Sequence, residues 1–246
     1  MQLSPNLHWL KAKLDDGLIG KLLQVDAFGK MDHRAGGEDM SVLGGHVFDL
    51  CRLFCDGDAE WCTARIMVKG SEVTLADVTE SEGDHVGPFI GDEINAQFSM
   101  PDGVFLNYTS RAKQLDVHGM GGWGVILTGT QGQVRVSFAI PQVIQYRNRS
   151  ADGNAEEWQP LAGDPTVAGD SMDQANQRLV DDLMAAIHNK QRNNHEGGGG
   201  GGVRASAERA MKAQEMIMAV FQAGLTRTRV TLPLAQRTHP LLPIIP

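Results

Sequence analysis

Two pairs of short alternating segments, each joined by a turn, constrain the fold of this chain more than any other feature. Residues 93–100 and 104–109 alternate apolar and polar side chains, with Pro101–Gly103 between them. This turn is a strong hairpin signal because proline presets φ and glycine accepts a positive φ. Residues 125–138 form a second such pair around Gly129–Gly132. Consecutive hairpins predict an antiparallel sheet, and the sequence lacks the regular strand–helix alternation of a doubly wound parallel sheet.

The remaining elements follow from hydrophobic periodicity. Further strands are predicted at residues 22–28, 61–68, 143–147 and 229–232. Helices are predicted at residues 7–14, 40–55, 173–189 and 205–223. Asp39 or Ser41 is expected to cap the second of these helices. In the third helix, one apolar side is formed by Leu179, Val180, Leu183, Ala186 and Ile187.

Charge and cysteine content exclude several classes of function. The 30 acidic and 22 basic residues give a net charge of −8 with no basic cluster, so nucleic acid is not an expected partner. No run of 18 apolar residues is present, and residues 1–10 lack the pattern of a secretory signal. Three cysteines do not make a disulfide framework. We therefore expect a cytoplasmic protein that does not enter a membrane.

Three sequence patterns that resemble ligand-binding motifs are better explained without a ligand. Gly119–Gly124 matches G-x-G-x-x-G, but the segment before it is polar and a hairpin strand follows, so a turn is expected. The six glycines Gly197–Gly202 lack the Lys-Ser/Thr pair of a phosphate loop and predict a flexible surface loop. Cys51 and Cys55 share a helix face, yet no further ligands complete a metal site, so buried apolar residues are expected.

His46 lies inside a helical pattern, directly after Gly44 and Gly45. Each glycine in a helix interior costs about 1 kcal/mol relative to alanine, a cost that is usually tolerated where another group approaches the backbone closely. His46 and Asp49 are three residues apart and share one side of the helix. An imidazole near a carboxylate and a glycine opening suits acid–base chemistry on a hydroxyl group. The alternative is a packed histidine with Asp49 as its structural partner.

A polar loop with two adjacent glycines, Gly36 and Gly37, leads directly into this helix. Its donors and acceptors are suited to binding a polyol, and the alternative is a solvated loop. The polar residues are Lys30, Asp32, His33, Arg34, Glu38 and Asp39. A weaker interpretation takes His33, Asp39 and His46 as metal ligands and would predict metal that is retained after dialysis.

Taken together, these segments match the pattern of a known family. The sequence resembles the C-terminal domain of the Gfo/Idh/MocA oxidoreductases, the family of glucose–fructose oxidoreductase and inositol dehydrogenase. The resemblance covers nearly the whole chain, and its most specific part is Gly36–Asp49. The segments that carry it are Asp16–Leu22, Arg34–Gly37, Gly44–Leu50, Gly57, Asn176–Leu183 and Ala210–Ala223.

The resemblance implies an α+β domain, residues 1–246, with an open, mostly antiparallel sheet, helices packed on one face and an elaborated ferredoxin-like core. It implies an NAD(P)-dependent oxidoreductase that acts on a CH–OH group of a sugar, polyol or related compound. In such enzymes an N-terminal Rossmann half binds NAD or NADP and supplies the catalytic lysine of a Glu-Lys-Pro motif, and this chain has neither feature. The resemblance further implies a homodimer or higher oligomer through the sheet, with the nucleotide half missing or supplied by a separate chain.

This sequence departs from the family pattern at two places. Many members carry an aspartate four residues before the motif histidine, where this chain has Val42. Asp39 is seven residues before His46, which is roughly 10 Å along a helix and too far to replace that contact directly. The second departure is the run Gly197–Gly202, where the family usually has a short proline-containing loop.

Two functional hypotheses follow. In the first, the chain is the substrate-binding domain of a dehydrogenase, inactive without a Rossmann half. His46 takes the hydroxyl proton, Asp49 orients it, and the sugar contacts come from Lys30, Asp32, His33, Arg34 and Asp39. In the second, the chain is a non-catalytic sugar-binding or assembly module that has kept the same fold, which Val42 and the absent nucleotide half both favour.

Overall fold

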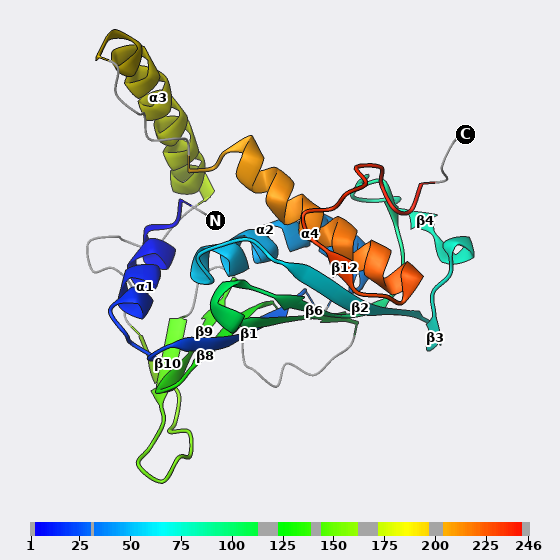
Figure 1. The fold of residues 1–246 in the computed structure, drawn as a ribbon, viewed down its shortest axis with the longest axis horizontal. Coiled ribbons are helices and arrows are strands. Elements are labelled where there is room, and N and C mark those ends of the chain that lie inside the picture. Colours follow the sequence, from blue (N-terminus) through cyan, green and yellow to red (C-terminus); the bar gives the residue numbers. More distant parts are fainter. Residues whose placement is uncertain are drawn as a thin grey trace.

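A long sheet forms the base of the molecule, and helices α2 and α4 lie across one of its faces (Figure 1). The computed structural model describes residues 3–30, 32–112, 123–138, 144–161, 172–196 and 204–242. The helices are α1 (Pro5–Asp15), α2 (Gly37–Phe54), α3 (Met172–Glu196) and α4 (Ala207–Thr226). The strands are β1 (Leu22–Phe28), β2 (Trp61–Val68), β3 (Ser71–Glu72), β4 (Thr79–Glu80), β5 (Pro88–Phe89), β6 (Glu93–Ser99), β7 (Phe105–Arg111), β8 (Gly124–Gly129), β9 (Gly132–Ser137), β10 (Ile144–Asn148), β11 (Gln159–Pro160) and β12 (Val230–Thr231).

The strand order of the large sheet is β11-β10-β9-β8-β1-β7-β6-β2-β12, with β3 on the outer part of β2. Both predicted hairpins are present, because β6 pairs with β7 and β8 pairs with β9 in antiparallel register. Strand β1 lies between the two hairpins. It pairs antiparallel with β8 and parallel with β7, where Val25 is opposite Leu106. The expected α+β fold with a mostly antiparallel sheet is confirmed, and among the described strands β1–β7 is the one parallel pair.

Helix α2 begins earlier than the periodicity of its apolar residues predicts. It starts at Gly37, and its N-cap position is Gly36, whose φ of 97° is unfavourable for residues with a side chain. A side chain on Gly37 would also collide with the backbone of Ile90. The prediction that Asp39 or Ser41 caps the helix was wrong, since Asp39 lies in the first turn and the Ser41 hydroxyl donates to the Gly37 carbonyl.

The core lies between the sheet and helices α2 and α4. Phe48 of α2 packs against Phe98 of β6 and Tyr108 of β7, with ring centroids 5.4 and 5.0 Å apart. From α4, Ile217 and Phe221 are fully buried against the same layer. The three cysteines are free and buried, as predicted for Cys51 and Cys55. This packing fixes which side of α2 faces the core and which side remains available to a ligand.

Helix α3 projects from the body of the molecule (Figure 1). Its predicted apolar side is present but faces solvent, because Leu179, Val180, Leu183 and Ile187 are exposed. The half-buried positions nearer the body include Arg178 and Asp182. Helix α3 is therefore amphipathic, but its apolar side faces solvent, whereas a helix that packs on the core of its own chain turns its apolar side inward.

Some sequence-based expectations fall on residues outside the described ranges. They are the Gly119–Gly122 part of the glycine motif, residue 143 at the start of one predicted strand, and the run Gly197–Gly202. Within the described ranges, none of the helices is both long and apolar enough to cross a membrane.

Candidate functional site

The loop between β1 and α2 holds a network of charged side chains. Asp32 accepts hydrogen bonds from the backbone N–H and from Nη2 of Arg34, at 3.0 and 3.1 Å, and its Oδ2 lies 3.2 Å from Lys30 Nζ. Arg34 extends the network to Asp84, with Nη1 2.9 Å from Oδ2. The side chains of Lys30, Asp32 and Asp84 are partly exposed. The loop thus carries paired charges, and the predicted sugar contacts of Lys30, Asp32 and Arg34 stay a prediction.

The electrostatics of this network hold its charges in place. Burial opposes ionisation of Asp32, but hydrogen bonds from Arg34 and Lys30 outweigh it and lower the pKa of Asp32 to about 2. Hydrogen bonds to Asp32 and Asp84 raise the pKa of Arg34. A fixed guanidinium with a carboxylate on each side suits the hydroxyl groups of a polar ligand, which can both donate and accept.

Asp39 occupies a different environment from the rest of the loop. It is fully buried, and its Oδ2 accepts hydrogen bonds from the Lys30 N–H at 2.9 Å and from the Ser110 hydroxyl at 3.2 Å. Burial raises the pKa of Asp39 to about 6, although both hydrogen bonds act in the opposite direction. Because its carboxylate contacts protein groups and no solvent, this geometry does not support the predicted direct contact with a sugar.

His46 lies on the outer side of α2, where its side chain is exposed. Partial loss of solvent around the ring lowers the pKa of His46, and the charge of Asp49 acts in the opposite direction. Beside it, a Cβ on Gly45 would meet no atom within 4 Å, so the predicted glycine opening is real at this position. A Cβ on Gly44 would instead lie 3.0 Å from Cγ of Met40, inside the packed side of the helix.

Asp49 is bound to arginine side chains. Arg52 Nη1 donates to its Oδ1 at 3.2 Å, and Arg209 Nε of α4 lies 3.7 Å from the same oxygen. The alternative interpretation, in which Asp49 is the structural partner of a packed His46, did not include these arginine contacts. Its carboxylate still acts on His46 through its charge.

The predicted residues form two groups. Lys30, Asp32, Arg34 and Asp39 belong to the loop and the first turn of α2. Within the described part of the chain, no hydrogen bond or ion pair joins His46 to any of them, or to His33. The described residues also contain no group of three or more histidine, cysteine, aspartate or glutamate side chains that could hold a metal, so the interpretation with His33 as a metal ligand is not supported.

Sequence reasoning missed three polar residues that complete the loop site. Ser110 and Tyr108 lie on the buried side of β7, and Asp84 reaches Arg34 from a distant loop. The alternation of β7 carried a signal for the first two, because positions 104, 106, 108 and 110 share one face. Val104 and Leu106 make that face apolar, so the sequence alone places the hydroxyl of Ser110 on a buried face.

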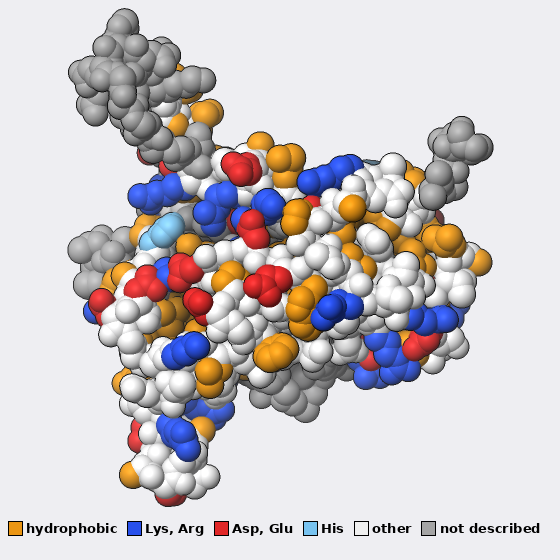
Figure 2. Space-filling view, viewed as in Figure 1, with side chains coloured by type: hydrophobic (Ala, Val, Ile, Leu, Met, Phe, Trp, Pro, Cys, Tyr) orange, Lys and Arg blue, Asp and Glu red, His pale blue; other side chains and the backbone are white. Residues whose placement is uncertain are grey.

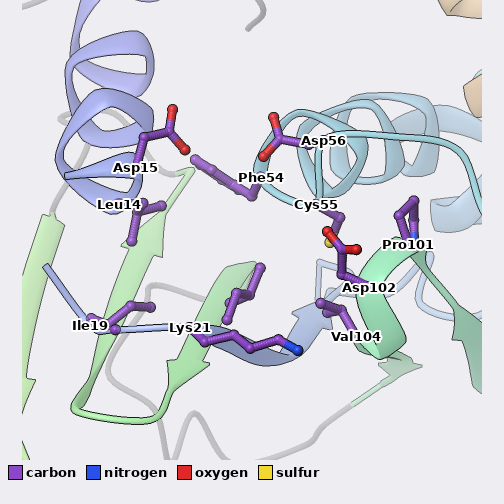
Figure 3. Close-up of a pocket in the computed structure, with 12 residues that line it drawn as sticks. Leu14, Asp15, Ile19, Lys21, Phe54, Cys55, Asp56, Pro101, Asp102 and Val104 are labelled. Carbon is purple, nitrogen blue, oxygen red and sulfur yellow. The ribbon is translucent and has the colours of Figure 1, made fainter. Parts of the chain in front are cut away.

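A hollow of about 190 Å³ lies at the other end of α2, away from these residues (Figure 3). Its rim carries Asp15, Asp56 and Asp102 above apolar side chains (Figure 3). Lys11 forms ion pairs with Asp15 and with Asp56, 2.9 Å from the latter, so two of these charges are already compensated. A second, more open hollow of about 640 Å³ between α1 and α3 is lined in part by His8 and Trp9. None of the predicted site residues lines either of these two hollows.

Comparison with known proteins supports the fold and leaves the chemistry open. No protein-family model and no curated protein matches the sequence. An NAD-binding oxidoreductase from Klebsiella pneumoniae matches 94% of this chain and 64% of its own, with 13% identity and a TM-score of 0.66. Levoglucosan dehydrogenase in complex with NADH and levoglucosan matches 94% of this chain and 64% of its own, with 16% identity and a TM-score of 0.57. A super-repressor mutant of Gal80p from Saccharomyces cerevisiae matches 94% and 63%, with 12% identity and a TM-score of 0.59.

These matches confirm the fold implied by the resemblance to Gfo/Idh/MocA oxidoreductases. This chain spans less than two thirds of the length of the proteins that it matches, which agrees with a resemblance to one of their domains. The described residues do not fit a dinucleotide. Such a site needs a strand, a glycine-rich turn and a helix within a parallel unit, and no helix joins the β1–β7 pair in that way.

Proposed function

We propose that residues 1–246 form the substrate-binding domain of an NAD(P)-dependent oxidoreductase that acts on the CH–OH group of a sugar or polyol. Oxidation of such a group removes one hydride and one proton, and the cofactor, held by a nucleotide-binding domain, would take the hydride. The residues of this chain are concerned with the proton and with the position of the sugar. Support comes from the fold shared with levoglucosan dehydrogenase, a sugar dehydrogenase by name.

The observation that carries the proposal is the exposed imidazole of His46 beside the open backbone of Gly45. Because the pKa of His46 is lowered, the ring is neutral near neutral pH and can accept a proton from a hydroxyl group. Asp49 stabilises the imidazolium that forms, through its charge. The ion network of Lys30, Asp32 and Arg34, with His33 beside it, would bind the remaining hydroxyl groups of the ligand.

Ligand binding can be tested on the 246-residue chain alone. We expect levoglucosan or myo-inositol to shift the imidazole resonances of His46 in NMR titrations, and the Arg34→Ala variant to bind the same ligand more weakly. Lys212→Ala is the matched control, since Lys212 pairs with Asp58 and Glu215 away from the loop. An absence of saturable shifts with sugars and polyols would refute the proposal.

A second candidate function is a non-catalytic binding or assembly module. Val42 stands where many members of the resembling family have aspartate, and one of the matched structures is named as a repressor. The two candidates differ in their response to His46→Ala when the chain is joined to a nucleotide-binding domain. An acid–base role predicts a loss of about 10²–10⁴-fold in kcat with unchanged folding. Unchanged turnover, or none in either protein, would favour the module.

Self-association through the sheet and a nucleotide-binding partner chain are further parts of this proposal. The sheet face opposite α2 and α4 carries hydrogen-bonded polar side chains, among them Asp26, Asn107 and Gln97. Sedimentation analysis at several protein concentrations would measure self-association directly. The cytoplasmic location predicted from the sequence remains a prediction.

A further inference from the structure

One carboxylate oxygen ties together both ends of the loop that carries Lys30, Asp32 and Arg34. Asp39 Oδ2 accepts the N–H of Lys30, at the start of the loop, at 2.9 Å. The same oxygen accepts the Ser110 hydroxyl at 3.2 Å, and Ser110 Oγ accepts the N–H of Gly36, at the end of the loop, at 2.8 Å. Asp39 therefore restrains the loop at Lys30 directly and at Gly36 through Ser110.

We call these hydrogen bonds of Asp39 to Lys30 and, through Ser110, to Gly36 the tie. The backbone is packed tightly around it. A Cβ on Gly29 would lie 2.7 Å from both Ser110 Oγ and Tyr108 Oη, and closer still to Asp39 Oδ2. Three oxygens from α2 and β7 thus converge on a single Cα atom, and a residue with a side chain could not occupy position 29 without moving them. The N–H of Gly29 is itself bound to the Thr109 carbonyl at 2.8 Å. The start of the loop is fixed by the sheet, and Asp39 adds restraints at Lys30 and, through Ser110, at Gly36.

Stability alone does not explain why an acidic residue occupies this position. Asp39 is fully buried, and within the described residues its Oδ1 has no hydrogen-bond partner. Burying an incompletely bonded carboxylate is unfavourable, and apolar groups of similar volume are often as stable or more stable at such positions. Features that oppose stability in this way are concentrated at functional sites.

We propose that Asp39 is the positioning residue of the candidate site: by holding Lys30 and, through Ser110, Gly36, it fixes the loop that presents Lys30, Asp32 and Arg34 to the ligand. Asp39 itself touches no ligand. This inference rests on the proposed function, because it assumes that the loop binds the sugar or polyol. It gives the buried Asp39, Ser110 and Gly29 a shared role that none of them has alone.

The tie depends on pH because a neutral carboxyl oxygen is a weaker hydrogen-bond acceptor than a carboxylate. The charged and titratable groups that face Asp39 are Asp32 and Arg34 of the loop and Tyr108 of β7. Asp32 disfavours the charge on Asp39, whereas Arg34 favours it. The hydrogen bonds from Lys30 and Ser110 lower the pKa of Asp39, so a local opening that breaks them and leaves Asp39 buried raises this pKa further. As the pH falls through about 6, Asp39 takes up a proton and the restraint on the loop weakens.

The experiment is amide hydrogen exchange of Lys30 and Gly36 in the 246-residue chain, corrected for the intrinsic pH dependence of exchange. We expect Asp39→Leu to accelerate exchange at both amides, and Ser110→Ala to accelerate it at Gly36 alone, by about tenfold or more. Protection in the wild type should fall as the pH is lowered through about 6, and Asp39→Asn should remove this dependence. Glu215→Gln is the matched control, because Glu215 is a buried carboxylate that accepts the Leu234 N–H at 2.9 Å, far from the loop in sequence and structure.

Three outcomes would overturn the tie: unchanged exchange in Ser110→Ala, unchanged exchange in Asp39→Leu, or the same pH dependence in Asp39→Asn as in the wild type. If Asp39→Leu does not fold, Ser110→Ala and Asp39→Asn decide the matter. Levoglucosan titrations of the same proteins test the positioning role. If a variant loosens the loop but binds levoglucosan with the affinity of the wild type, the tie is only structural, and the positioning role of Asp39 is overturned. If the wild type binds neither levoglucosan nor myo-inositol, the proposed function fails, while the exchange rates still decide whether the tie exists.

Discussion

Asp39 links proton binding to the stability of the fold. Its pKa in the folded protein is about 6, against an ordinary value of 3.8. Between these values the folded chain holds a proton that the unfolded chain has released, so the free energy of unfolding decreases as the pH rises through this window. A raised carboxyl pKa of this size corresponds to roughly 3 kcal/mol, which is gained at low pH and lost above about pH 6.

The first prediction compares the wild type with Asp39→Asn. The asparagine remains neutral, so from about pH 4 to about pH 7 the wild type should lose roughly 3 kcal/mol of stability relative to the variant. Urea unfolding at both pH values measures this difference. Loop protection should change with pH in the opposite direction to global stability, because the charged carboxylate holds the loop more strongly while its burial is unfavourable. Parallel pH curves for the two proteins would contradict the assignment.

The second prediction concerns Gly45. A methyl group there meets open space inside a helix, so Gly45→Ala should raise the free energy of unfolding by about 0.5–1 kcal/mol. If a ligand approaches this backbone beside His46, the same methyl group should weaken levoglucosan binding. Gly44→Ala is the control, because its methyl group would crowd Met40 and should stabilise the helix less. A variant that is more stable and binds levoglucosan as well as the wild type would remove the functional reason for Gly45.

At the scale of the elements, local patterns predicted the strands better than the start of α2. The strands at residues 22–28 and 61–68 are observed with the predicted boundaries, because alternation and flanking turn residues are local signals. The start of α2 depends on a tertiary contact, in which Gly37 donates to the Gly91 carbonyl at 3.0 Å from a distant loop. The parallel pairing of β1 with β7 likewise joins segments about 80 residues apart and has no local signal.

The same distinction explains the candidate site. The composition of the loop predicted a polar segment, and in the structure Lys30, Asp32 and Arg34 form an ion network there. The burial of Asp39 could not be predicted, because its position in the first turn of α2 follows from where that helix begins. Its partner Ser110 lies 71 residues further along the chain, and the β-sheet pairing that brings them together is long-range.

The third prediction concerns the exposed apolar side of α3, where the hydrophobic side chains of its described part are visible (Figure 2). Leu183 is 49% exposed, whereas Leu50 of α2 is fully buried. Leu50→Ala should therefore destabilise the chain by about 2–5 kcal/mol, and Leu183→Ala should change the free energy of unfolding by less than about 0.5 kcal/mol. Urea unfolding of both variants tests this. A large, concentration-dependent effect of Leu183→Ala would mean that another molecule covers α3 in solution.

For the molecule as a whole, the sheet separates two surfaces with different properties. One face is covered by α2 and α4 (Figure 1). His46 belongs to α2, and the loop site directly precedes that helix. On the other face, Trp158 packs over Phe28 and Ile126, with the guanidinium groups of Arg135 and Arg147 4.5 and 4.4 Å from its ring. The proposed ligand-binding and self-association surfaces therefore lie on opposite sides of the sheet and can be altered independently.

The final prediction follows from this division of roles. A dinucleotide binds in a unit whose helix directly connects two parallel strands, whereas in the described residues the connection from β1 to its parallel partner β7 runs through α2 and strands β2–β6. We therefore expect NAD and NADP to leave the melting temperature of the 246-residue chain unchanged, while levoglucosan or myo-inositol raises it with the logarithm of the ligand concentration above Kd. The His46→Ala variant should keep the first property and weaken the second. A rise of the melting temperature with increasing NAD concentration would show that this chain binds the cofactor by itself. The catalytic residues would then be expected around that nucleotide, and not on a surface that a second domain completes.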